Sequence, residues 1–143
     1  MSWLGWALLS AFFAGITAVL AKVGVASVNS HLATAVRTTV VLLFTWAIAL
    51  AAVPLASLGT MPRRAWLFLT LSGVATGLSW LCYFRALQLG QASRVAPVDK
   101  LSVIIAIALA AVFLREQLTW QHWLGGALVV TGVLVLAWPA GAA

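Results

Sequence analysis

Five apolar stretches, each long enough to cross a lipid bilayer as a helix, occupy almost the whole chain. A membrane-spanning helix needs about 20 mostly apolar residues. Only 7% of the 143 residues are charged and the mean hydropathy is +1.13, so a water-soluble domain would lack polar surface. We therefore predict an all-α integral membrane protein whose single domain, residues 1–143, is a bundle of five transmembrane helices. The predicted helices cover residues 3–25, 31–53, 66–89, 97–114 and 121–138.

Residues that form turns or cap helices separate these stretches. Asn29 precedes the second stretch, Pro54 follows it, and Gly90 follows the third. Pro97 is predicted to open the fourth helix, where its missing N–H costs nothing, and Thr119 to cap the fifth. Because all connections are short, consecutive helices are expected to be antiparallel neighbours.

Several functional classes are not expected from these residues. The first Lys or Arg is Lys22, so the first stretch lacks the basic segment of a signal peptide and is predicted to be a retained helix. The net charge of +6 is scattered along apolar runs, which argues against nucleic-acid binding. His31 and His122 fall at opposite membrane faces, and Cys82 has no partner for a nucleophilic pair. We predict no enzyme, no cofactor and no metal.

The basic residues give a weak orientation signal. We define face A by the N-terminus and segments 54–65 and 115–120, and face B by segments 26–30 and 90–96 and the C-terminus. Face A is expected to hold three arginines in loops, namely Arg63, Arg64 and Arg115, and face B one, Arg94. If cations near helix ends are added, face B leads by five to three. The positive-inside rule thus gives two answers, and insertion in both orientations (dual topology) is compatible with the sequence.

Four different helices each place a cation near face B, namely Lys22, Arg37, Arg85 and Lys100. Each side chain alone could be an interfacial anchor that snorkels to the headgroups. Together they predict a basic vestibule. Asp99 is the only acid in a predicted span and is expected in the first turn of the fourth helix. It is either a cap paired with Arg94 or Lys100, or a residue that carries a coupling proton.

The third stretch carries a polar stripe at helical spacing, formed by Ser72, Thr76, Ser79 and Tyr83. Each hydroxyl alone could simply bond to the carbonyl one turn earlier. A continuous stripe, flanked by Trp80 and Arg85, instead indicates the wall of a polar cavity. Gly73 and Gly77 form a small-residue pair beside it, suited to the close approach of another helix. The predicted substrate-binding residues are Ser72, Thr76, Ser79, Trp80, Tyr83, Arg85, Arg37 and Lys100, and the gating or coupling residues are Asp99 and Lys22.

Three segments, ATAVRTT at 33–39, LSGVATGLSWLCYFRALQLG at 71–90 and VAPVDKLS at 95–102, resemble the EamA-type repeat of the drug/metabolite transporter superfamily. The LRE at 114–116 looks like the end of that repeat. The resemblance covers nearly the whole chain. It implies secondary transport of small metabolites or drug-like solutes by two inverted five-helix repeats around a central cavity. This chain contains only one such repeat.

A single repeat with an odd number of helices can reach the two-repeat architecture by pairing with an inverted copy of itself. We therefore predict an alternating-access transporter of a small solute in the bacterial inner membrane, acting as an antiparallel homodimer. The solute would carry an anionic or zwitterionic group. The alternatives are a membrane-assembly or lipid-carrier flippase subunit without independent solute transport, and a channel.

Overall fold

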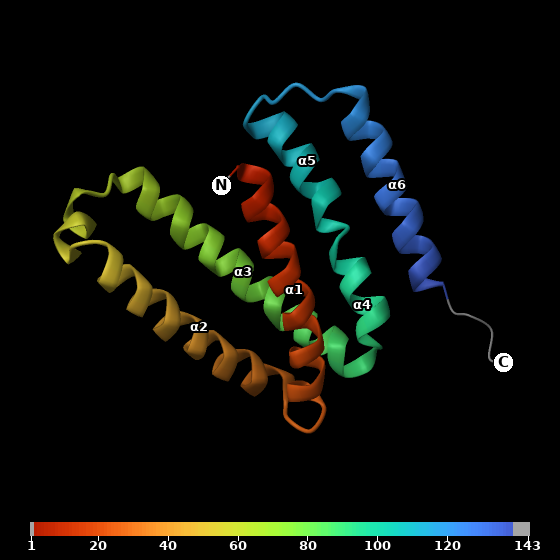
Figure 1. Ribbon diagram of the computed structural model, residues 1–143, viewed down its shortest axis with the longest axis horizontal. Coiled ribbons are helices and arrows are strands. Elements are labelled where there is room, and N and C mark those ends of the chain that lie inside the picture. Colours follow the sequence, from red (N-terminus) through yellow and green to blue (C-terminus); the bar gives the residue numbers. More distant parts are fainter. Residues whose placement is uncertain (1, 139–143) are drawn as a thin grey trace. The chain divides into compact units, whose positions relative to one another are not determined.

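A computed structural model describes residues 2–138, which form helices joined by short turns and contain no strand. Five segments are long and apolar enough to span a membrane, which confirms the all-α membrane class and the number of spans. α4 and α5 together form one of these spans. In chain order the elements are α1 (Trp3–Val25), α2 (Ser30–Ala52), the 3₁₀ helix η1 (Leu55–Thr60), α3 (Arg63–Leu89), α4 (Ala92–Asp99), α5 (Ser102–Phe113) and α6 (Trp120–Ala137) (Figure 1).

The third helix begins earlier than predicted. The Pro62 carbonyl accepts hydrogen bonds from the N–H groups of Ala65 (2.9 Å) and Trp66 (3.3 Å), so the helix starts directly after this proline. Arg63 and Arg64 therefore form its first turn. Their assignment to a loop was wrong, and so was that of Arg94, which lies in α4. Of the four arginines expected in loops, Arg115 remains in one, at φ 56°.

The fourth span begins at Ala92 instead of Pro97 and is interrupted between α4 and α5. Pro97 lies inside α4, where it cannot donate to the preceding turn. The turn that follows is tighter than an α-helix, because backbone N–H groups donate to the carbonyl three residues earlier. This holds for Lys100, Leu101, Val103 and Ile104. Asp99 is consequently the last residue of α4, and its predicted place in a first turn was wrong.

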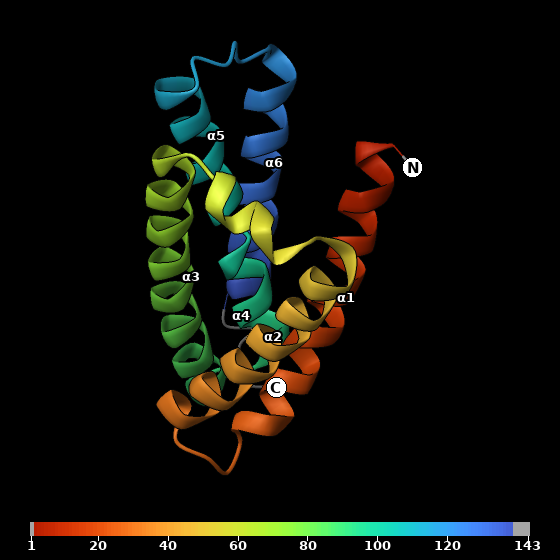
Figure 2. The ribbon, with the colours of Figure 1, turned by 90° about the vertical axis from the view of Figure 1, so that its left-hand side faces the viewer.

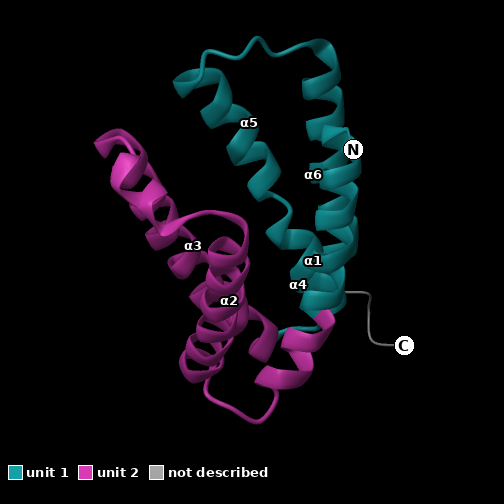
Figure 3. Cartoon of the chain, turned by 60° about the vertical axis from the view of Figure 1, so that its left-hand side comes forward, with its two compact units in different colours: residues 1–18, 90–143 teal, residues 19–89 magenta. Residues whose placement is uncertain are grey.

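The described chain divides into two compact units (Figure 3). Residues 19–89 form unit 2, in which α2 and α3 are joined through η1 (Figure 2). Their packing is tightest where the first turns of α2 meet the last turns of α3 and of α1. Thr34, Val25, Phe84 and Leu87 are buried there. The N-cap Asn29 holds the start of α2, because its side-chain oxygen accepts from the His31 N–H at 2.9 Å.

Unit 1 holds the beginning of α1 together with α4, α5 and α6. α4 and α5 pack along α6, and a Cβ built at Gly126 would lie 3.3 Å from Cδ1 of Ile104. The predicted cap of the last helix is confirmed. Thr119 forms a capping box with His122, whose Nδ1 accepts from the Thr119 N–H at 3.0 Å.

Large apolar side chains point away from the packed interior on every long helix. Phe12, Leu43 and Leu78, for example, are each about 60% exposed. In water such a surface would drive aggregation, whereas in a bilayer it is solvated by lipid. A membrane protein of this kind does not need a large buried core, because each helix satisfies its own backbone hydrogen bonds and lipid covers its apolar side chains.

Candidate functional site

A cation–π contact joins α2 to α3 in unit 2. The Arg37 guanidinium lies 4.1 Å from the centre of the Trp80 ring and 5.6 Å from that of Phe84. Arg37 is about 10 Å along α2 from Ser30, at a depth where an unsolvated charge is costly. Stacking on an aromatic face offsets part of that cost. The structure therefore brings together two of the predicted substrate-binding residues, Arg37 and Trp80.

The guanidinium keeps its hydrogen-bonding capacity in this position. Arg37 is half-buried, and stacking occupies one face of its planar group. Its described contacts are with the two aromatic rings, and it also interacts electrostatically with Tyr83. An arginine offers five N–H donors in a planar fork that matches a carboxylate or phosphate. The stacked Arg37 is thus arranged to receive an anionic group from outside the described chain.

α3 carries two adjacent stripes with different surroundings. Trp80, Phe84 and Leu87 form the packing stripe, which faces the rest of unit 2. The predicted polar stripe (Ser72, Thr76, Ser79 and Tyr83) lies beside it, about 40–100° around the helix from Trp80.

The first three hydroxyl residues of the polar stripe are exposed, and Tyr83 is half-buried. The Thr76 hydroxyl donates to the Ser72 carbonyl at 2.9 Å, the bond expected of an isolated threonine in a helix. The structure places these hydroxyl residues on one surface of α3 but packs none of the first three against Arg37. The predicted cavity lining therefore stays a prediction.

The last turns of α3 are tied to the end of α1 and to the turn before α2. Lys22 donates through Nζ to the Leu87 carbonyl at 2.6 Å. The Gln88 amide donates to the Val28 carbonyl at 2.6 Å and to the Val25 carbonyl at 3.4 Å. We call Lys22, Arg85 and Gln88 the polar clamp.

Arg85 belongs to the polar clamp because its Nη1 donates to Oε1 of Gln88 at 3.0 Å. In this arrangement Lys22 and Arg85 form contacts at the end of α3. Their predicted roles, gating or coupling for Lys22 and substrate binding for Arg85, stay predictions. Sequence reasoning missed Gln88 and Phe84. The available signal was a glutamine three residues after an arginine, within an apolar run, since that spacing places both side chains on one helical face.

Asp99 and Lys100 lie in unit 1 at the break between α4 and α5. The Lys100 ammonium is 3.3 Å from Oδ2 of Asp99, and both side chains are more than a third exposed. This confirms Lys100 as an ion-pair partner of Asp99. A carboxylate at the end of α4 opposes the helix dipole, so the neighbouring cation compensates for its position.

Comparison with known proteins identifies the family. A family model described as the EamA-like transporter family matches residues 1–138. A Sinorhizobium protein named "Uncharacterized transporter in cobO 3'region" is 54% identical over 136 residues, which are 95% of this chain and 96% of that protein.

A more distant similarity is to the probable 4-amino-4-deoxy-L-arabinose-phosphoundecaprenol flippase subunit ArnE of Yersinia pseudotuberculosis. It is 31% identical over 71 residues, which are 50% of this chain and 62% of the subunit. No solved structure matches the chain significantly. The family match over both units, together with the relative matched along nearly its whole length, shows that the chain belongs to the EamA-like transporter family.

Proposed function

We propose that this chain is one half of an alternating-access transporter for a small solute with an anionic or zwitterionic group, completed by an inverted second copy in a bacterial inner membrane. The observation that carries the proposal is the Arg37 guanidinium, stacked on Trp80 at a depth along α2 where a charge is costly. A cation held at this depth is expensive and is commonly part of a substrate or ion pathway.

The surface of α3 supports the need for a second copy. Ser72 and Ser79 are exposed on a helix that spans the bilayer. Hydroxyls are more favourable against protein or water than against lipid tails. A Cβ at Gly73 or Gly77 would meet no atom within 4 Å, so this small-residue surface is open for another helix. An inverted copy would cover it and would place two equivalent sites around one midplane cavity.

The relatives support transport by a protein of this size. The Sinorhizobium relative, named a transporter, is matched over 96% of its length by this single-repeat chain. The partial similarity to the ArnE flippase subunit favours a second candidate, a subunit that needs a different partner chain to move a lipid-linked sugar. The two functions differ in whether the purified chain moves a solute alone.

The first experiment is a ligand screen on the purified full-length chain. Carboxylates, phosphate esters, amino acids and organic cations are compared for their ability to raise its melting temperature in detergent. We expect stabilisation by a compound with a carboxylate or phosphate group, and saturable uptake of that compound into proteoliposomes.

Arg37→Gln is then compared with Arg37→Lys and with Arg115→Asn, which removes a loop cation and suits the left-handed backbone there. We expect Arg37→Gln to abolish both stabilisation and uptake, Arg37→Lys to retain part of each, and Arg115→Asn to behave like the unaltered protein. Uptake by Arg37→Gln at the original rate contradicts the proposed site. Purified chain that moves no solute, but gains activity with a second protein, favours the flippase-subunit alternative.

A further inference from the structure

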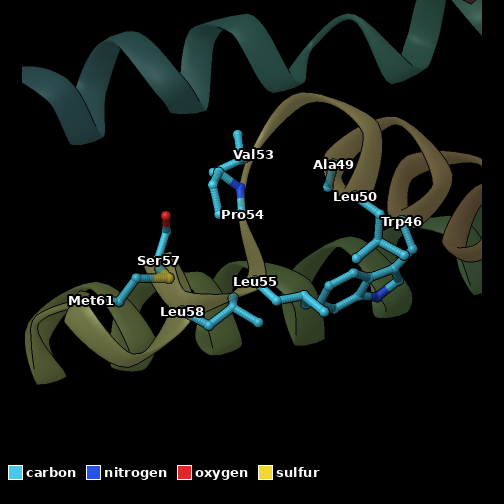
Figure 4. Close-up of a pocket in the computed structure, with 9 residues that line it drawn as sticks. All are labelled: Trp46, Ala49, Leu50, Val53, Pro54, Leu55, Ser57, Leu58 and Met61. Carbon is cyan, nitrogen blue, oxygen red and sulfur yellow. The ribbon is translucent and has the colours of Figure 1, made fainter.

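Unit 2 contains an apolar cavity of about 240 Å³ where α2 turns into η1 (Figure 4). One wall is the last part of α2 with the two residues after it, Val53 and Pro54, and the other is formed by η1 and Met61. Leu55 and Leu58 of η1 lie along the same side as the Trp46 indole in the close-up. The cavity arises because Pro54 ends α2 and directs the chain into a short 3₁₀ helix that lies beside it.

The lining selects an apolar occupant. Ser57 is the only lining residue with a polar side-chain group apart from the Trp46 indole N–H. A polar solute would lose hydrogen bonds to water there without replacing them. Pockets for whole drug-sized ligands usually measure about 300–1,000 Å³, so this smaller cavity suits a segment of a longer apolar chain.

Two arginines follow closely in the chain after Met61, the last residue that lines the cavity. Arg63 and Arg64 follow Met61 by two and three residues, which places the Arg63 Cα within about 8 Å of the Met61 Cα. Both arginines are exposed, and the Arg64 guanidinium lies 5.7 Å from the Phe68 ring. Two adjacent like charges are stabilised by an anion between or beside them.

The depth of these groups matches the geometry of a phospholipid. Trp46 lies about 9 Å along α2 from its last residue, Ala52, and therefore within the apolar layer. Arg63 and Arg64 open α3 at the interface. We propose that the turn between α2 and α3 binds an anionic phospholipid, with an acyl-chain segment in the cavity and the phosphate at the two arginines. Basic pockets at helix ends recognise anionic headgroups through this combination.

Tryptophan quenching by brominated lipids tests this site on the full-length chain in phosphatidylcholine vesicles. Bromine on an acyl chain quenches only tryptophans that it touches, and subtracting the emission of Trp46→Phe isolates the signal of Trp46. A minor fraction of the lipid is replaced by brominated phosphatidylglycerol or by brominated phosphatidylcholine. We expect the anionic lipid to be favoured about tenfold, because two interfacial cations act on it.

The preference is expected to disappear in Arg63→Gln/Arg64→Gln and to persist in Arg115→Asn, which removes one cation elsewhere. Ala49→Phe, which fills the cavity from α2, is expected to reduce quenching by both lipids. Native mass spectrometry of the unaltered chain and the double arginine variant provides a second readout, in which phosphatidylglycerol adducts remain on the unaltered chain only. Equal quenching by the two brominated lipids, or a preference kept by the double variant, overturns the proposal. Neither readout involves solute transport.

Discussion

The Arg37 guanidinium lies 4.1 Å from the centre of the Trp80 ring, so a charge on α2 and an aromatic ring on α3 share one contact within unit 2. The contact holds a planar cation in a fixed orientation without consuming its hydrogen-bond donors. It is therefore both a link between two helices and a candidate recognition element.

Trp80→Leu is expected to destabilise the protein by about 1 kcal/mol more than Trp80→Phe does. The phenylalanine variant keeps an aromatic face for Arg37, whereas leucine offers none. Unfolding of both variants in detergent, followed by circular dichroism, measures the difference. Equal stability of the two variants would show that the contact contributes no cation–π energy.

Gln88→Met is expected to loosen the connection between α1 and α2. The variant keeps a side chain of similar length but loses the donors to the Val28 and Val25 carbonyls, at a cost of about 1 kcal/mol. Hydrogen exchange of the peptide covering residues 26–30 should accelerate. Gln121→Met, at an exposed position of α6, serves as the control. Unchanged exchange in the Gln88 variant would contradict the assigned role of the polar clamp.

Pro97→Ala is expected to regularise the junction between α4 and α5. Alanine supplies the N–H that proline lacks and removes the steric conflict with the preceding turn. Amides of residues 97–104 should exchange more slowly than in the unaltered protein. Pro62→Ala, just before α3, changes a proline outside a helix interior and should leave this segment unaffected. Faster exchange in Pro97→Ala would show that the interruption has another cause.

Gly73→Leu/Gly77→Leu is expected to disrupt self-association while preserving the fold of the single chain. A Cβ at either position meets no atom within 4 Å, so added side chains are tolerated until a second copy approaches. We expect the dimer fraction, measured by light scattering in detergent, to fall about tenfold or more. Gly132→Leu places the same side chain at an equally open position of α6 and is the control. A dimer unaffected by the double variant excludes this surface of α3 as the interface.

A reporter fused after Ala143 is expected to be found on both sides of the membrane. Arg63 and Arg64 compete with the cations near the other helix ends, so neither face dominates. Arg63→Gln/Arg64→Gln should shift the population toward one orientation. A strictly one-sided reporter in the unaltered protein would exclude the antiparallel homodimer.

Several features were predictable because they depend on neighbouring residues alone. Thr119 signals the start of α6 and Gly90 follows the end of α3, as the caps and breakers of these helices require. The prediction that Pro97 opens the fourth helix also depended on neighbouring residues alone, and it was wrong. A proline is favourable in a first helical turn, and the sequence alone did not show that α4 already begins at Ala92. That earlier start also moved Asp99 to a helix end.

The sequence by itself determined the membrane class and the five spans, because lipid offers no hydrogen bonds and each span must satisfy its own backbone. It also indicated the polar stripe of α3, since that stripe depends only on helical spacing. The tertiary structure decided that Trp80 meets Arg37 and that Gln88 meets the carbonyls of the first turn. These pairings depend on the rotation of each helix about its axis. Helices that are apolar on every side carry no pattern that specifies this rotation, so packing alone sets it.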